Sequence, residues 1–189
     1  MSQRWKLGLA VAAIILGGLH QALAAPSLIG DTVTATYLHD STVVASSDIL
    51  VQAPFPELTC PGGFTGGGLC NAFAEGATLD IEALKIVLNE NAGAVYGTFT
   101  FDGIDFTGLN FGDNAPLIGY TLTTDLPGLT PANISFTNDS ISYNAEGLSF
   151  VNAPYFIELD LQVPEPGSLT LLGAALAGLG LMYRRRSLT

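Results

Sequence analysis

The chain has little positive charge, and this shortage excludes one class of protein at the outset. Its 189 residues contain six Lys and Arg against seventeen Asp and Glu. A nucleic-acid-binding protein needs a basic surface to neutralise phosphates, so we expect no nucleic-acid partner. Only 12% of the residues are charged and 48% are hydrophobic. This balance excludes a chain that is disordered throughout, because such chains are poor in apolar residues.

Groups that commonly carry catalysis are also scarce. Of the two histidines only His39 lies beyond residue 24, where an N-terminal signal would be removed, and this excludes a multi-histidine metal site. We expect His39 to be an exposed structural residue after a strand. No G-x-S-x-G motif is present, and the glycine-rich segment 62–68 lacks the Gly-Lys-Ser/Thr end of a phosphate-binding loop. The only tryptophan, Trp5, lies at the N-terminus, where it could not serve as a sugar platform for a glycosidase. We therefore predict that the protein is not an enzyme, with a hydrolase as a remote alternative.

Residues 1–24 are typical of a secretory signal peptide. A short basic start precedes the apolar run 7–19, and Ala22 and Ala24 form the small-x-small pattern of a signal peptidase site. The apolar run would span about 20 Å as a helix, too little for a membrane core of about 30 Å. We predict that signal peptidase cuts after Ala24 and that the chain from Ala25 onward is exported.

The other end of the chain, 163–189, predicts a membrane anchor. It begins with Val163, Pro164, Glu165 and Pro166. An uncharged run over 167–183 follows, which as a helix covers about 25 Å and suits a transmembrane span. Three bases then follow: Arg184, Arg185 and Arg186. Positive charge after a span stays on the cytoplasmic side, so the preceding domain would face away from the cytoplasm.

This tail resembles the PEP-CTERM sorting signal of Gram-negative bacteria, over about residues 163–186. Pro164, Glu165 and Pro166 match its motif, and the three arginines match its basic end. The resemblance implies that an exosortase, a transpeptidase-like membrane protease, recognises the tail and cleaves near Pro-Glu-Pro. The family is associated with exopolysaccharide and biofilm matrix, but its middle domains are diverse. The resemblance therefore implies a destination and leaves the activity of the middle domain open.

The middle segment, 25–162, is acidic and patterned as β-structure. It holds sixteen carboxylates and one lysine, a formal charge of −15. Short runs of alternating apolar and polar residues, separated by Gly, Asn, Asp and Pro, predict an all-β antiparallel β-sandwich or jelly-roll-like domain. The expected strands cover 31–38, 42–51, 77–88, 94–101, 117–124, 132–137, 140–144 and 155–162. A hairpin turn is expected at Asn138 and Asp139, and 79–88 is the one run that could also be helical.

Two features of the middle segment suggest specific sites. Cys60 and Cys70 enclose a glycine-rich loop, and in an exported protein they should form a disulfide. Asp102, Asp105 and Asp113 crowd a segment of Phe-Gly turns, where hard oxygen ligands would suit Ca²⁺. No EF-hand spacing is present, so a solvated acidic surface is the alternative. Calcium is the only cofactor that the sequence suggests.

We therefore expect an exported, noncatalytic surface or extracellular-matrix protein, associated with exopolysaccharide or biofilm. The alternative is a polysaccharide-binding or adhesion module that uses calcium or works without it. Its partners in export would be signal peptidase and an exosortase, and its C-terminal helix would hold it in the membrane for a time. The expected final location is the cell surface or the extracellular matrix.

Overall fold

The structure of the protein is a computed structural model, which describes residues 25–54, 56–62, 64–91, 94–95, 97–112, 114–150, 154–165, 173 and 176–178. The chain divides into two units, one formed by both termini (1–25 and 165–189) and one spanning 26–164. The second unit contains every strand of the described residues and corresponds to the segment 25–162, which the sequence predicts to be an exported domain.

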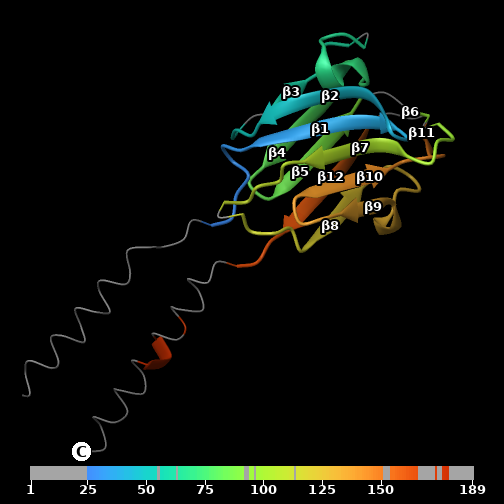
Figure 1. The fold of residues 1–189 in the computed structure, drawn as a ribbon. Coiled ribbons are helices and arrows are strands. Elements are labelled where there is room, and N and C mark those ends of the chain that lie inside the picture. Colours follow the sequence, from blue (N-terminus) through green and yellow to red (C-terminus); the bar gives the residue numbers. More distant parts are fainter. Residues whose placement is uncertain are drawn as a thin grey trace, which may run out of the picture. The chain divides into compact units, whose positions relative to one another are not determined.

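The exported domain consists of two five-stranded antiparallel sheets and one small two-stranded sheet (Figure 1). Sheet A has the strand order β2 (Thr42–Leu50), β1 (Thr32–His39), β7 (Asp102–Thr107), β10 (Ser140–Asn144) and β9 (Ile134–Phe136). Sheet B has the order β3 (Leu58–Thr59), β4 (Thr78–Glu82), β5 (Lys85–Glu90), β12 (Tyr155–Gln162) and β8 (Gly119–Thr124). The small sheet pairs β6 (Ala94–Val95) with β11 (Ser149–Phe150).

Alternation of side chains builds the core between the two large sheets. Along β12, every second residue from Tyr155 to Leu161 is buried, as a strand with one covered face requires. One hydrophobic cluster joins the inner faces of the two sheets. It includes, from sheet A, Val33, Ala35, Ile104, Phe106, Ile141 and Tyr143 and, from sheet B, Leu79, Ile81, Ile86, Leu88, Ile157 and Leu159. This is the arrangement of a β-sandwich, so the all-β prediction is confirmed at that level.

The main correction to the sequence prediction is β7. The segment around it was expected to be a loop of Phe-Gly turns, yet β7 lies at the centre of sheet A between β1 and β10. Its alternation is hidden because Asp and Gly, which are uncommon in strands, occupy three of its six positions. Gly103 is required there, because a Cβ atom would clash with the carbonyl oxygen of Tyr143 on β10. The sequence pattern therefore did not predict this central strand, in which Gly103 allows β10 to approach closely.

Other expectations agree more closely with the structure. The hairpin at Asn138 and Asp139 is confirmed, since β9 and β10 pair antiparallel and the Thr137 N–H donates to the Ser140 carbonyl at 3.0 Å. The run 77–88 is β-structure, but a turn at Ala83 and Leu84 divides it into β4 and β5. The predicted transmembrane span 167–183 lies mostly outside the described residues. Within them, residues 173 and 176–178 are helical, and no helix is long and apolar enough to cross a membrane.

Candidate functional site

The sorting segment begins where the folded domain ends. Gln162 is the last residue of β12, and Val163 is partly buried against the core cluster. Pro164 and Glu165 are exposed. Pro166, Arg184, Arg185 and Arg186 lie outside the described residues, as do Ala22 and Ala24 of the predicted signal cleavage site. The first exposed residue of the motif therefore follows the last strand by two positions.

The predicted disulfide is confirmed. Cys60 and Cys70 are bonded, with their Cα atoms 5.2 Å apart. The bridge closes the loop that carries the short helix η2 (Gly68–Asn71), and the N–H of Leu69 donates to the Ser47 hydroxyl of β2 at 2.8 Å. Gly68 has a positive φ of 53°, and a Cβ atom on it would clash with the same hydroxyl. The glycines thus let the loop lie against β2, an edge strand of sheet A.

The structure does not bring together the two described aspartates of the calcium prediction. Asp102 and Asp105 are three positions apart on β7, so they point to opposite faces of sheet A. Asp102 is 1% exposed, while Asp105 is only half-buried, and burial raises the pKa of its carboxyl group. Asp113, the third residue, lies outside the described residues. Among those described, no group of three metal-ligating side chains occurs.

Asp102 has partners of its own that the sequence did not reveal. Its Oδ1 atom accepts a 2.6 Å hydrogen bond from the Tyr37 hydroxyl, and its Oδ2 atom accepts one from the N–H of Gly97. The Nε2 atom of His39 lies 3.5 Å from Oδ1, and the His39 ring stacks on Phe99 at a centroid distance of 4.3 Å. His39 was expected to be exposed after the strand, but it is the last residue of β1, has only a third of its side chain exposed and contacts a buried carboxylate. The contact between His39 and Asp102 depends on the pairing of β1 with β7, so a local sequence pattern does not predict it.

Carboxylates of β4 and β12 form a charged face on sheet B. Lys85 on β5 lies 3.2 Å from Glu158 and 3.5 Å from Asp160, both on β12. The hydrogen bond to Glu158 is the main cause that raises the pKa of Lys85. Across the sheet, burial is the main cause that raises the pKa of Asp80, and the negative charges of Glu57 and Glu82 add to it. The single lysine of the domain therefore balances part of an acidic strand face.

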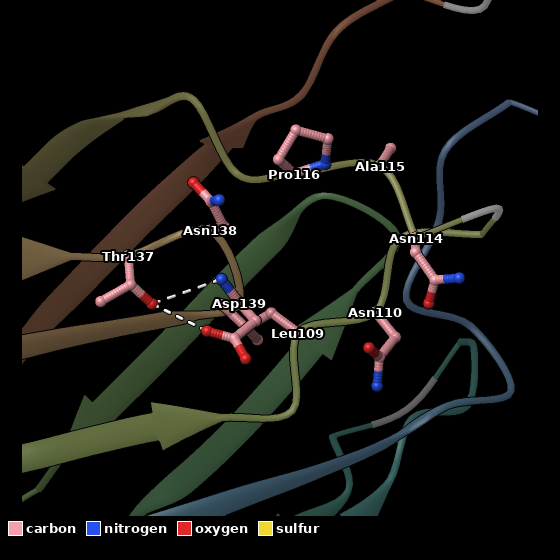
Figure 2. A pocket seen from close by; sticks show the side chains of 8 residues that line it. All are labelled: Leu109, Asn110, Asn114, Ala115, Pro116, Thr137, Asn138 and Asp139. Carbon is pink, nitrogen blue, oxygen red and sulfur yellow. Dashed lines mark hydrogen bonds between the residues drawn. The ribbon is translucent and has the colours of Figure 1, made fainter.

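A polar hollow of about 760 Å³ opens where two loops meet (Figure 2). One loop joins β7 to β8, and the other joins β9 to β10. Backbone bonds fix them to one another, since Leu117 donates to the Asn138 carbonyl at 2.8 Å and Leu109 to the Asp139 carbonyl at 2.9 Å. The lining residues are Leu109, Asn110, Asn114, Ala115, Pro116, Thr137, Asn138 and Asp139. This first hollow was missed by the sequence prediction because its residues come from separated loops.

The chemistry of the first hollow suits a ligand with many hydroxyl groups. No described residue makes a hydrogen bond with the side-chain amides of Asn114 and Asn138, and each amide offers both donors and acceptors. Thr137 is less available, because its hydroxyl bonds with the Asp139 carboxylate at 2.8 Å. A hydroxyl group both donates and accepts, so amides that face solvent can pair with it in either sense.

Together these features define a small acidic β-sandwich followed directly by a proline-rich C-terminal segment. A family model of the PEP-CTERM protein-sorting motif matches residues 162–186, and the chain carries that motif. The motif implies an exported protein that an exosortase processes and sorts at the membrane or cell surface. No curated protein and no solved structure matches the chain.

Proposed function

We propose that this chain is a noncatalytic structural protein of the cell surface or extracellular matrix, associated with exopolysaccharide in biofilm. The observation that carries the proposal is the sorting motif at residues 162–186, which starts on the last residue of β12, the final strand of the domain. A motif at this position would deliver the β-sandwich itself to the surface.

The contacts of the carboxylates that could act in catalysis support a structural role for the protein. The Asp102 carboxylate is occupied by Tyr37 and Gly97, which belong to the fold. Glu158 and Asp160 are engaged with Lys85 on a strand face. A glycosidase needs one carboxyl group to donate a proton and a second to act as a base or nucleophile, with both lining a cleft. These carboxylates instead hold strands together.

The intact mass of the protein recovered from the cell surface and the medium tests this proposal. We expect a chain that begins at Ala25 and ends near Pro166, because signal peptidase and the exosortase would each remove one end. The matched control replaces Pro164, Glu165 and Pro166 with alanine, and it should keep its tail and remain with the membrane. A wild-type mass that runs to Thr189 in every fraction would contradict the proposed processing.

A second candidate function is polysaccharide binding, and the first hollow is the observation that favours it. Its free amides match a hydroxyl-rich ligand, and the loops that form it are fixed by backbone hydrogen bonds. A site that is already formed loses less conformational freedom on binding, which favours affinity.

A further inference from the structure

A second, aromatic hollow lies beside the first one. It has a volume of about 440 Å³ and is lined mainly by residues of β8 and by side chains from two other segments. Those that matter here are Tyr120, Thr121, Pro131, Phe136 and Gln162. Phe136 is 42% exposed, and its ring meets that of Tyr120 edge to face at a centroid distance of 5.6 Å. An exposed aromatic ring at this spot is available to a ligand.

The aromatic pair is held in a fixed position. The Tyr120 hydroxyl donates to the Pro131 carbonyl at 2.9 Å, which fixes the orientation of its ring. Pro131 begins the short helix η3 (Pro131–Asn133) that leads into β9, so this bond ties the edge of sheet B to the edge of sheet A. Gln162 and Thr121, joined at 3.3 Å, place an amide and a hydroxyl beside the rings. Aromatic surface and polar groups therefore occur together in a preformed hollow.

The two hollows follow one another along the same side of the domain. Strands β8 and β9 are the edge strands of their sheets and lie at the same end of the sandwich (Figure 1). Phe136 lines the second hollow, and its chain neighbour Thr137 lines the first. On the facing segment, Pro116 lines the first hollow and Gly119 the second, with the exposed Ile118 between them. Four residues of extended chain cover about 13 Å, so the two hollows together could hold a few sugar units.

We propose that this side, from Tyr120 and Phe136 to Asn114 and Asn138, binds a chain of neutral sugars. The proposal rests on the second candidate function and assigns its site and ligand class. The apolar face of a sugar ring packs on Phe136, where aromatic surface is removed from water. The hydroxyl groups at the edge of the chain bond with the free amides of Asn114 and Asn138.

Charge favours a neutral ligand. The described lining of the two hollows contains one carboxylate, Asp139, and no basic residue. The surrounding segment, 25–162, has sixteen carboxylates and one lysine. A polysaccharide rich in carboxylate groups would be repelled by this field unless a cation intervened.

Affinity electrophoresis tests the proposal with the full chain kept in mild detergent. The gels contain dextran, galactomannan or hydroxyethylcellulose as neutral probes, and alginate with or without calcium as the anionic probe. Wild type should be retarded by at least one neutral probe. Phe136→Ala and Asn138→Ala should each weaken that retardation about fivefold. Asn138 is preferred to Asn114 as a target because Asn114 has a positive φ of 54°, so that changing it would also alter the backbone.

Phe64→Ala is the matched control, since Phe64 is 63% exposed but belongs to the disulfide loop. Its φ of 52° is as unfavourable for phenylalanine as for alanine, so this change, unlike one at Asn114, removes no residue suited to that backbone conformation. It should leave the retardation unchanged. Phe136→Leu keeps an apolar side chain and removes only the ring, so it replaces Phe136→Ala if that variant unfolds. Thermal unfolding of every variant checks the fold.

The possible outcomes test the proposed site separately from the polysaccharide-binding function on which it rests. Retardation that persists in the Phe136 and Asn138 variants would overturn the site while polysaccharide binding stands. No retardation by any probe would overturn both. If alginate with calcium is the only probe that retards the protein, the proposal of a neutral ligand is overturned and calcium-dependent binding is favoured.

Discussion

Glu90, the last residue of β5, is a carboxylate inside the domain. It is 5% exposed, and burial raises its pKa from 4.5 to about 7, against the opposing effect of a hydrogen bond from the Ala74 backbone. Between these two values the folded chain binds more protons at this site than the unfolded chain does. The contribution of Glu90 to the free energy of unfolding therefore falls as pH rises from about 4.5 to 7.

We predict that Glu90→Gln stabilises the protein at pH 8 by about 2 kcal/mol and has little effect at pH 4. Glutamine has nearly the shape of protonated glutamate and keeps an acceptor for the Ala74 N–H, but it has no charge to desolvate. Urea unfolding at the two pH values measures the difference. Glu146→Gln, at an exposed position, is the control and should change stability equally little at both values. An equal effect of Glu90→Gln at pH 4 and pH 8 would contradict the argument.

Among the secondary-structure elements, β2 shows how the domain protects an exposed edge. This nine-residue edge strand carries Val43 and Val44 with 59% and 43% of their surface exposed. A long, apolar edge strand invites pairing with other chains. The disulfide loop lies against it through the Leu69–Ser47 hydrogen bond, and Leu69 itself is fully buried. The loop therefore covers part of an edge that would otherwise be open.

We predict two effects when Cys60 and Cys70 are both replaced with serine. The free energy of unfolding should fall by about 2–3 kcal/mol, because the unfolded chain gains freedom over the ten-residue separation. The released loop should also expose β2 and increase aggregation, which light scattering at the growth temperature measures. Adding Val44→Lys to the double variant should reduce that aggregation, since charge on an edge opposes pairing. Aggregation that Val44→Lys leaves unchanged would show that β2 is not the edge involved.

At the scale of the whole molecule, the core and the sorting segment belong to different parts of the chain. The buried cluster contains residues from Leu28 to Leu161, with Val163 packed at its border. Removal of the tail beyond Pro164 therefore takes away none of the described residues of the core. A domain separated from its tail at this point should keep its fold.

We predict that a chain ending at Pro164 has the same melting temperature as the full chain, within about 2 °C. A chain ending at Asp160 is the comparison, because it lacks Leu161 and the end of the ladder between β12 and β8. Loss of this buried leucine should cost about 2 kcal/mol and lower the melting temperature by several degrees. Differential scanning calorimetry measures all three chains. A large loss of stability in the chain ending at Pro164 would mean that the tail supports the domain.

Much of the molecule could be predicted because its signals are local. Alternation marked β1 and β12, the turn residues at Asn138 and Asp139 marked a hairpin, and Cys60 and Cys70 are close enough in sequence to suggest their bond. The Pro-Glu-Pro tripeptide and the basic end of the tail are each a short continuous run of residues, so the sequence alone shows both of them. The central strand β7 was missed because its aspartates and its glycine interrupt the alternation of apolar and polar residues. Gly103 suits the neighbouring strand β10, and that requirement is not visible in the local sequence.

The sequence by itself determined the β-structure of the domain, its acidity, its disulfide and its PEP-CTERM motif. These follow from periodicity, composition and short spacings, which need no knowledge of how the chain folds back. Only the tertiary structure decided the strand order of the sheets, the contact of His39 with Asp102 and the hollows beside β8 and β9. The physical reason is that each of these joins residues far apart in sequence, whose meeting depends on how strands pair and sheets pack.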